Sequence, residues 1–117
     1  MVNNVKINID NSAGVATIDI EGVIGTPSYT EEDKVATYDA FKGKIAEIGN
    51  ANPRKVVVNI RSTGGDVNDA LLIYDALKGV KNGETICYGY TASAATIIAQ
   101  AAAQGKRKMS ANGLYLI

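Results

Sequence analysis

Three consecutive valines lie at the centre of residues 55–60, and this run constrains the fold more than any other feature of the chain. A β-branched run without polar alternation is typical of a strand buried in a parallel sheet. Helical patterns precede and follow it, and further strands are predicted at residues 85–89 and 114–117. Helix and strand alternate with about 30 residues per βαβ unit. The chain is therefore predicted to form an α/β fold with a mostly parallel sheet and right-handed crossovers.

The N-terminal segment predicts a hairpin. Apolar and polar residues alternate in residues 5–9 and again in residues 16–20, which favours two half-buried strands. The turn between them is expected at residues 11–14, and the second strand is expected to close at residues 22–25.

Three helices are expected from the apolar spacing. The first covers residues 30–50, from a capping-box pattern of Thr30 and Asp33 to a C-cap at Gly49 and Asn50. The third is alanine-rich and covers residues 92–104. The apolar stripe of the first helix comprises Val35, Tyr38, Phe41, Ile45 and Ile48, and that of the second comprises Val67, Leu71, Tyr74 and Leu77.

Composition narrows the classes of function. The 117 residues suit one domain, and 12 basic and 12 acidic residues cancel, which argues against a nucleic-acid or membrane-surface partner. The single cysteine, Cys87, allows no internal disulfide and is expected to be a buried mid-strand residue. The N-terminus does not resemble a signal peptide, and residues 91–103 are too short to span a bilayer. We therefore expect a cytoplasmic protein without metal or cofactor.

Two strand-to-helix corners carry the candidate site: Ser62-Thr63-Gly64-Gly65, and the segment from Gly89 to Ser93. Both lie at carboxyl ends of predicted parallel strands, where ligands bind in such sheets. Paired glycines allow a close backbone approach, and a helix start offers unpaired N–H groups. The corners could thus supply a nucleophile and oxyanion donors, although each is also explained by a tight turn or a helix cap. The P-loop pattern G-x-x-x-x-G-K-S/T and the dinucleotide pattern G-x-G-x-x-G are both absent, so nucleotide binding has no support. G-x-S-x-G is also absent, which excludes a hydrolase nucleophile elbow of that type.

Taken in order, residues 56–117 resemble the Clp peptidase (ClpP) family of serine peptidases. The matching pieces are the Ser-x-Gly-Gly corner, Ile73-Tyr74-Asp75, Thr85-Ile86-Cys87, the small residues around Ser93, and Gly105-Lys106-Arg107. The resemblance implies a ClpP/crotonase-like fold of repeated ββα/βαβ units, and a single peptidase domain over residues 1–117.

The resemblance also implies the roles of individual residues. Ser93 corresponds to the nucleophile, Gly65 and Ala94 to the oxyanion-hole donors, and Gly64 and Thr63 to substrate-binding positions. Thr63 stands where the family has proline and Ala95 where glycine is common. Ala-Ser-Ala-Ala around Ser93 is nearer to the ClpP-like prohead proteases of tailed phages, so a phage or prophage member is expected.

A serine nucleophile needs a base, and the chain contains no histidine. The family uses a Ser-His-Asp triad whose histidine directly follows a strand like residues 114–117. We therefore expect the domain to be C-terminally truncated and inactive as given. A lysine would be the alternative base. The nearest in sequence, Lys106 and Lys108, are expected to lie about 20 Å from Ser93 at the far end of the third helix, which disfavours them.

Two other functions stay open. A crotonase-like acyl-CoA enzyme would use the Gly65 and Ala94 amides without Ser93 as nucleophile, and a non-catalytic assembly module would use neither. For the peptidase, the resemblance implies a peptide or protein substrate, a homo-oligomer and an ATPase or capsid partner, with no nucleic acid or membrane involved.

Overall fold

The computed structural model describes residues 2–3, 5–10, 14–25, 34–80, 82–103, 105–111 and 113–116, with backbone only for residues 2–10 and 34–35. Of the turn predicted at residues 11–14 only Gly14 is described, with a φ of 70°, and the Thr30–Asp33 pattern lies outside the described residues. No helix within the described residues has the length and apolar character needed to cross a bilayer. The helices are α1 (Tyr38–Ala51), α2 (Val67–Lys78) and α3 (Ala95–Ala99). The strands are β1 (Val2–Asn3), β2 (Val5–Asp10), β3 (Val15–Ile24), β4 (Lys34–Ala36), β5 (Lys55–Gly65), β6 (Gly83–Ala92), β7 (Arg107–Met109) and β8 (Leu114–Leu116).

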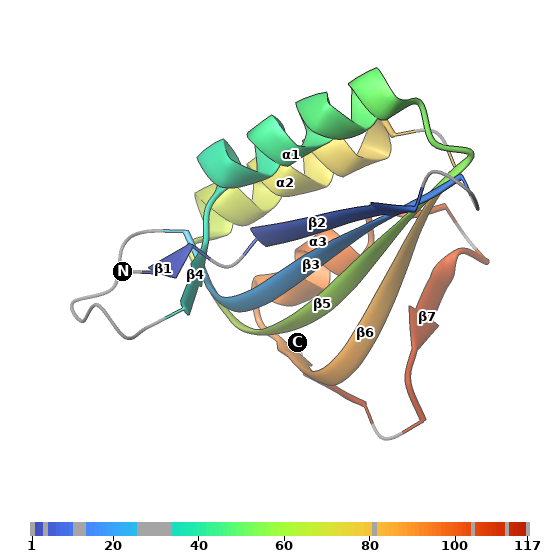
Figure 1. Ribbon diagram of the computed structural model, residues 1–117. Coiled ribbons are helices and arrows are strands. Elements are labelled where there is room, and N and C mark those ends of the chain that lie inside the picture. The colour runs from blue at the N-terminus through green and yellow to red at the C-terminus, as the bar shows by residue number, and fades with distance from the viewer. Residues whose placement is uncertain are drawn as a thin grey trace.

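One twisted sheet organises the described residues (Figure 1). Its strand order is β1-β4-β3-β5-β6-β7, with β2 added antiparallel to β3 and β8 added parallel to β6. The central pairs β3–β5 and β5–β6 are parallel. The predicted α/β fold with a mostly parallel sheet is therefore confirmed.

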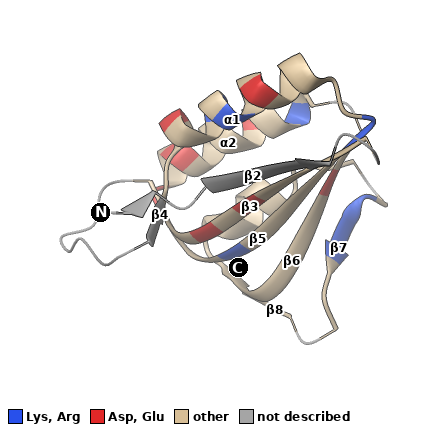
Figure 2. Cartoon of the chain, viewed as in Figure 1, with Lys and Arg blue, Asp and Glu red and all other residues tan. Residues whose placement is uncertain are grey.

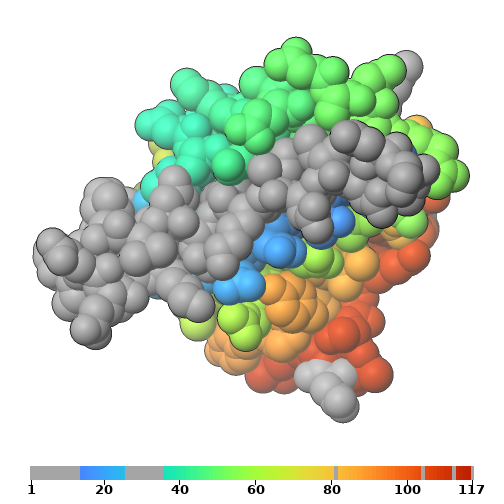
Figure 3. Space-filling view, in the orientation of Figure 1, coloured from blue at the N-terminus to red at the C-terminus, as the bar shows by residue number. Residues whose placement is uncertain are grey.

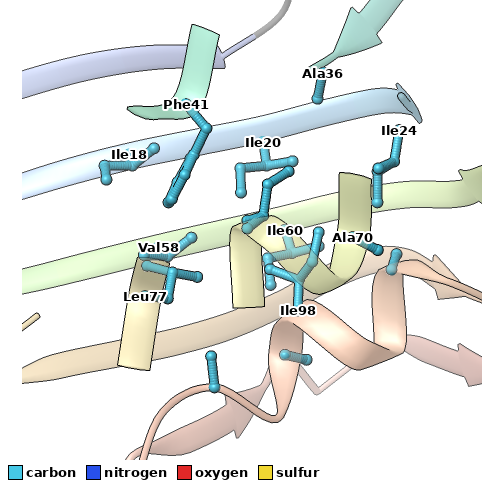
Figure 4. Packing of buried hydrophobic residues seen from close by; sticks show 14 of the residues in the cluster. Ile18, Ile20, Ile24, Ala36, Phe41, Val58, Ile60, Ala70, Leu77 and Ile98 are labelled. Carbon is cyan, nitrogen blue, oxygen red and sulfur yellow. The ribbon is translucent and has the colours of Figure 1, made fainter. Parts of the chain in front are cut away.

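The helices cover one face of the sheet, and the core lies between them. Figure 4 shows apolar side chains of β3 and β5 directed towards α1, α2 and α3. The largest fully buried side chains include Phe41 of α1, Ile20 of β3, Ile60 of β5, Ile73 of α2 and Ile98 of α3. Burial of this apolar surface is the main force that holds helices and sheet together.

The other face of the sheet is polar and open. The run at residues 55–60 was expected to be a fully buried strand. On β5, however, buried Val56, Val58 and Ile60 alternate with less buried residues, so only one face of the strand is covered. Asn59 donates to Asp19 Oδ1 across this open face, at 2.9 Å. In the space-filling view, β3, β5 and β6 follow one another here in blue, light green and orange (Figure 3).

The first helix starts later than predicted. It begins at Tyr38, and its N-cap is Thr37, whose Oγ1 accepts a hydrogen bond from the Ala40 N–H at 3.2 Å. Val35, expected on the helix, lies in β4, where it pairs with Val23 of β3. A β-branched residue beside a sheet edge gains a strand partner there, which overrides the helical spacing.

The same helix also ends later than predicted. It continues through Gly49 and Asn50 to Ala51, and Asn52 is the C-cap with a φ of 50°. The Asn52 N–H donates to the Ile48 carbonyl at 2.9 Å. Asparagine tolerates this left-handed conformation better than most residues, so it can end a helix as glycine does.

The buried face of α2 differs from the predicted one. Ala70, Ile73 and Leu77 face the core, whereas Val67 and Leu71 are 54% and 47% exposed. Leu77 is thus buried as predicted, and Ala70 and Ile73 complete the buried face. Asp69 on α2 also contacts α1, because its Oδ2 accepts a hydrogen bond from the Tyr38 N–H at 3.1 Å.

The third helix is much shorter than the predicted span of residues 92–104. It covers only Ala95–Ala99, and residues after it turn back towards β7. The Arg107 Nε–H donates to the Ala102 carbonyl at 3.0 Å, which holds this turn. Tertiary hydrogen bonding therefore overrides the helix propensity of alanine here.

Glu84 joins three strands at the end of the sheet where β5 and β6 begin. Its carboxylate is 4% exposed and forms ion pairs with Lys55 of β5 at 2.6 Å and Lys108 of β7 at 2.5 Å. Hydrogen bonds from Lys108 and Lys55 lower the pKa of Glu84 from 4.5 to about 2, against the effect of burial. Figure 2 shows the basic residues of β7 beside this end of the sheet.

Glu84 should make the stability of the fold dependent on acid pH. Because its folded-state pKa is lowered, its contribution is complete above its unfolded-state pKa near 4.5 and is lost as the pH falls towards 2. Urea unfolding midpoints measured between pH 5 and 2 should therefore fall less steeply for Glu84→Gln than for the wild type. Glu47→Gln, on the exposed face of α1, should keep the wild-type slope; equal slopes for all three proteins would contradict the assignment.

Gly43 should be replaceable with a gain in stability. It lies inside α1 with a negative φ, and a β-carbon there would contact nothing within 4 Å. Gly43→Ala is expected to raise the free energy of unfolding by about 0.5–1 kcal/mol, since alanine loses less backbone entropy in a helix. Urea denaturation tests this; a destabilised variant would mean that the α1 surface is covered in solution.

Candidate active site

The two predicted corners lie side by side at the carboxyl ends of β5 and β6. The strands pair in parallel as far as Ser62 and Thr91. Beyond that point β5 continues through Gly64 and Gly65 to the N-cap of α2, whereas β6 turns at Ser93 into α3. The alignment of strand ends brings together segments about 30 residues apart in the sequence.

Gly64 makes the contact between the corners. Its φ is 101°, and an added β-carbon would lie 2.8 Å from the Ala92 carbonyl oxygen, 2.8 Å from Ser93 Cβ and 3.0 Å from Ala94 N. Only glycine fits both this conformation and this spacing. The buried Ser62 hydroxyl oxygen accepts a hydrogen bond from the Gly64 N–H at 3.0 Å and fixes the direction of the corner.

Ser93 adopts a left-handed backbone conformation with a φ of 54°. Such a conformation costs a serine roughly 1–2 kcal/mol, so it persists only where surrounding contacts hold it. The Ser93 N–H donates to the Leu116 carbonyl of β8 at 2.7 Å, and the Ser93 carbonyl accepts from the Thr96 N–H at 3.0 Å and from Thr96 Oγ1 at 2.6 Å. The residue is exposed, and within the described residues its hydroxyl has no hydrogen-bond partner. The backbone is thus fixed while the nucleophile candidate faces solvent.

The two amides predicted as oxyanion donors differ in their surroundings. Ala94 is 3% exposed, and its N–H donates to no carbonyl among the residues that the structure describes. Gly65 has a φ of 146° and packs against Ile24 of β3, whose carbonyl accepts the N–H of the next residue, Asp66, at 2.8 Å. Gly64 is therefore the glycine at which an added β-carbon would meet the Ser93 turn, whereas one at Gly65 would meet Ile24. Thr63, the other predicted substrate contact, is exposed.

The lysines considered as an alternative base lie at the opposite end of the sheet. The expected third helix is wrong beyond Ala99, but Lys108 pairs with Ile86 of β6, seven residues before Ser93. At about 3.3 Å per strand residue, that is roughly 23 Å. Lys108 is bound to Glu84, as described above. Cys87 is buried as predicted, and burial raises the pKa of its thiol, which disfavours the reactive thiolate.

Sequence reasoning missed the residues that hold the corners in place. Ser62 was noted only as part of the glycine corner. Thr96 was noted only as part of the predicted third helix, and Tyr115 only as part of the strand predicted at residues 114–117. Ser62 two residues before a glycine is a signal for a local side-chain turn. No comparable signal marks Tyr115, because its partners lie 15 and 19 residues away. Among the described residues no group of three or more potential metal ligands is present.

Known proteins with similar sequences and folds are Clp proteases. The Clp protease family model matches residues 31–117. The ATP-dependent Clp protease proteolytic subunit of Streptococcus mutans is 42% identical over 67 residues, which are 56% of this chain and 34% of that protein. Proteolytic subunit 1 of Corynebacterium glutamicum is 32% identical over 89 residues, 75% of this chain and 43% of that protein. The chain thus spans about a third to less than half of the relatives it matches.

Solved structures agree on the fold. A ClpP1 mutant from Listeria monocytogenes has a TM-score of 0.71 and 24% identity, covering 86% of this chain and 54% of that one. The ClpP catalytic domain from Plasmodium falciparum has a TM-score of 0.62 and 23% identity, covering 85% and 51%. At these identities the similarity establishes the arrangement of helices and strands.

Gly64→Ala should separate the two corners. The methyl group would clash with the Ala92 carbonyl and Ser93 Cβ, and alanine is strained at a φ of 101°. We expect a loss of about 1–3 kcal/mol in the free energy of unfolding, measured by urea denaturation, and large amide shift changes at Ser93 and Ala94 in NMR spectra. Gly49→Ala is the matched control, because nothing lies within 4 Å of its added β-carbon. Unchanged Ser93 and Ala94 shifts in Gly64→Ala would contradict the contact.

Proposed function

Because this chain belongs to the Clp protease family, we propose that its two corners form the nucleophile and oxyanion-hole part of a serine peptidase active site. The observation that carries the proposal is the contact of Gly64 with Ser93 and Ala94. It places an exposed serine hydroxyl and backbone amides of two strands in one small region. An acyl-transfer site needs this combination, because charge develops on the carbonyl oxygen as the hydroxyl attacks.

In the proposed reaction, Ser93 Oγ attacks the carbonyl carbon of a peptide bond. The new oxyanion accepts hydrogen bonds from the Ala94 N–H and the Gly65 N–H. Within the described part of the chain the amide of buried Ala94 donates to no carbonyl, which supports its role, since a buried N–H needs a hydrogen-bond partner. Gly65 is supported by strand alternation: the Asp66 N–H points to β3, so we expect the Gly65 N–H to point to the β6 side, where Ser93 lies.

The proposed base comes from outside the 117 residues, which contain no histidine. β8 runs parallel to the end of β6, and its Leu116 carbonyl accepts the Ser93 N–H. The described end of β8 therefore lies beside the Ser93 backbone, which supports an imidazole supplied from this side as the base that takes the hydroxyl proton. Without that base, the 117 residues alone are proposed to be nearly inactive as a peptidase.

The wider properties of the whole protein are part of the same proposal. We propose a peptide or protein substrate, assembly with further copies, and an ATPase or capsid partner. The names of the relatives, which describe ATP-dependent proteolytic subunits, support the ATPase. A cytoplasmic location and membership of the phage-type branch stay predictions. The crotonase-like and assembly-module alternatives would leave Ser93 dispensable, whereas its strained and exposed conformation favours a role in chemistry.

Covalent labelling of Ser93 tests the proposal. The 117-residue protein is treated with an alkyl fluorophosphonate with and without imidazole in solution, and adducts are located by mass spectrometry. General bases contribute about 10²–10⁴-fold to such reactions, so added imidazole should speed labelling of Ser93 at least about tenfold. Ser93→Ala should abolish the imidazole-dependent adduct.

Ser110 serves as the internal control, because it is an exposed serine in the segment that follows β7. Imidazole is expected to change its labelling no more than that of free serine. Equal labelling of Ser93 and Ser110 under both conditions would mean that the corners do not activate the hydroxyl, and the peptidase proposal would fail.

A further inference from the structure

We propose that Thr96 and Tyr115 are positioning residues that hold the Ser93 turn in its left-handed conformation; the catalytic consequence rests on the proposed function of Ser93. The Thr96 side chain, on α3, bonds to Ser93 directly. The Tyr115 side chain, on β8, bonds to Thr96 and Gln100 beside the turn. Neither one contacts the reacting atoms in this arrangement, so they act through the Ser93 backbone.

Thr96 binds the carbonyl side of the turn. Its N–H and its Oγ1 both donate to the Ser93 carbonyl oxygen, at 3.0 Å and 2.6 Å. The N–H bond belongs to the first turn of α3, and any residue except proline at position 96 would supply it. The hydroxyl bond depends on the side chain, and Thr96 is only 7% exposed, so water cannot easily replace it.

Tyr115 joins the other side of the turn to the same helix. Its hydroxyl donates to the Thr96 carbonyl at 3.3 Å and accepts from Gln100 Nε2 at 2.7 Å. The next residue on β8 is Leu116, whose carbonyl accepts the Ser93 N–H at 2.7 Å. Tyr115 therefore links β8 to α3 by hydrogen bonds, at the position next to Leu116, which binds the Ser93 amide.

The hydrogen bonds of Thr96 and Tyr115 form a brace around the Ser93 turn, and a chain of further hydrogen bonds orients the Tyr115 hydroxyl within it. Arg107 Nη1 donates to Gln100 Oε1 at 2.6 Å, so the amide nitrogen of Gln100 is turned towards Tyr115. Because the Tyr115 oxygen accepts that bond, its own proton is directed to the Thr96 carbonyl. The network thus runs from β7 through α3 and β8 to both backbone groups of Ser93.

The shortness of α3 explains why such a brace is needed. Five residues make too few internal hydrogen bonds to fix a helix start by themselves. The strained conformation of Ser93 would relax if α3 or β8 moved, and the Ser93 turn would then shift relative to the Gly64 corner.

Amide hydrogen exchange and labelling together test the inference on the 117-residue protein. Thr96→Val and Tyr115→Phe remove one hydroxyl each and keep most of the packing. Both are expected to lower the exchange protection of the Ser93 amide about three- to tenfold, and the imidazole-dependent labelling of Ser93 by a similar factor. Thr96→Ser, which restores the hydroxyl, should recover most of both losses.

Tyr88→Phe is the matched control, because the Tyr88 hydroxyl bonds to Glu21 on the open face of the sheet. It should leave Ser93 exchange and labelling at wild-type values. Unchanged Ser93 protection in Tyr115→Phe, or an equal loss in Tyr88→Phe, overturns the positioning role. If the wild type never labels at Ser93 while exchange responds as expected, the brace stands and the peptidase proposal falls. Should Thr96→Val not fold, Tyr115→Phe decides alone.

Discussion

The close approach of Gly64 to the Ser93 turn is the contact on which the candidate site depends. Two parallel strands end at the same level, and a glycine with a φ of 101° lets the end of one lie against the turn of the other. Any side chain at position 64 would push the turn away and separate the serine hydroxyl from the glycine corner. The chemistry proposed for this chain therefore follows from backbone spacing as much as from the identity of Ser93.

The two ends of the sheet differ in the residues that they gather: ion pairs at one end and the candidate site at the other. At the end where β5 and β6 begin, Glu84 and two lysines join three strands through short ion pairs. At the other end, three residues with a positive φ, Ser93, Gly64 and Gly65, gather around the candidate site, and Ser93, which is not a glycine, is strained. Strain of this kind persists only where the rest of the structure over-determines it. The apolar core between sheet and helices, together with Thr96 and Tyr115, provides that constraint.

The sequence was sufficient for the parallel strands and for the pair of corners, because β-branched runs and glycine pairs act locally. It was insufficient where the bounds or the orientation of an element depend on contacts with residues distant in sequence. Val35 lies in a strand that pairs with β3, and Asp69 of α2 binds the start of α1. Beyond Ala99 the alanine-rich segment is not helical, and there the Ala102 carbonyl accepts a hydrogen bond from Arg107. For the same reason Ser93 could be singled out from the residue types around it, whereas Tyr115, bonded to residues 15 and 19 positions away, could not.

A crystal structure of the Ser93 phosphonyl adduct, prepared in imidazole, would test the central claim most directly, because the adduct resembles the tetrahedral intermediate of acyl transfer. The account predicts that its phosphonyl oxygen lies within about 3 Å of both the Ala94 and the Gly65 amide nitrogens, with Gly64 still against the turn. An oxygen directed into solvent, or a Gly65 amide turned away from it, would contradict the claim that the two corners form one oxyanion hole.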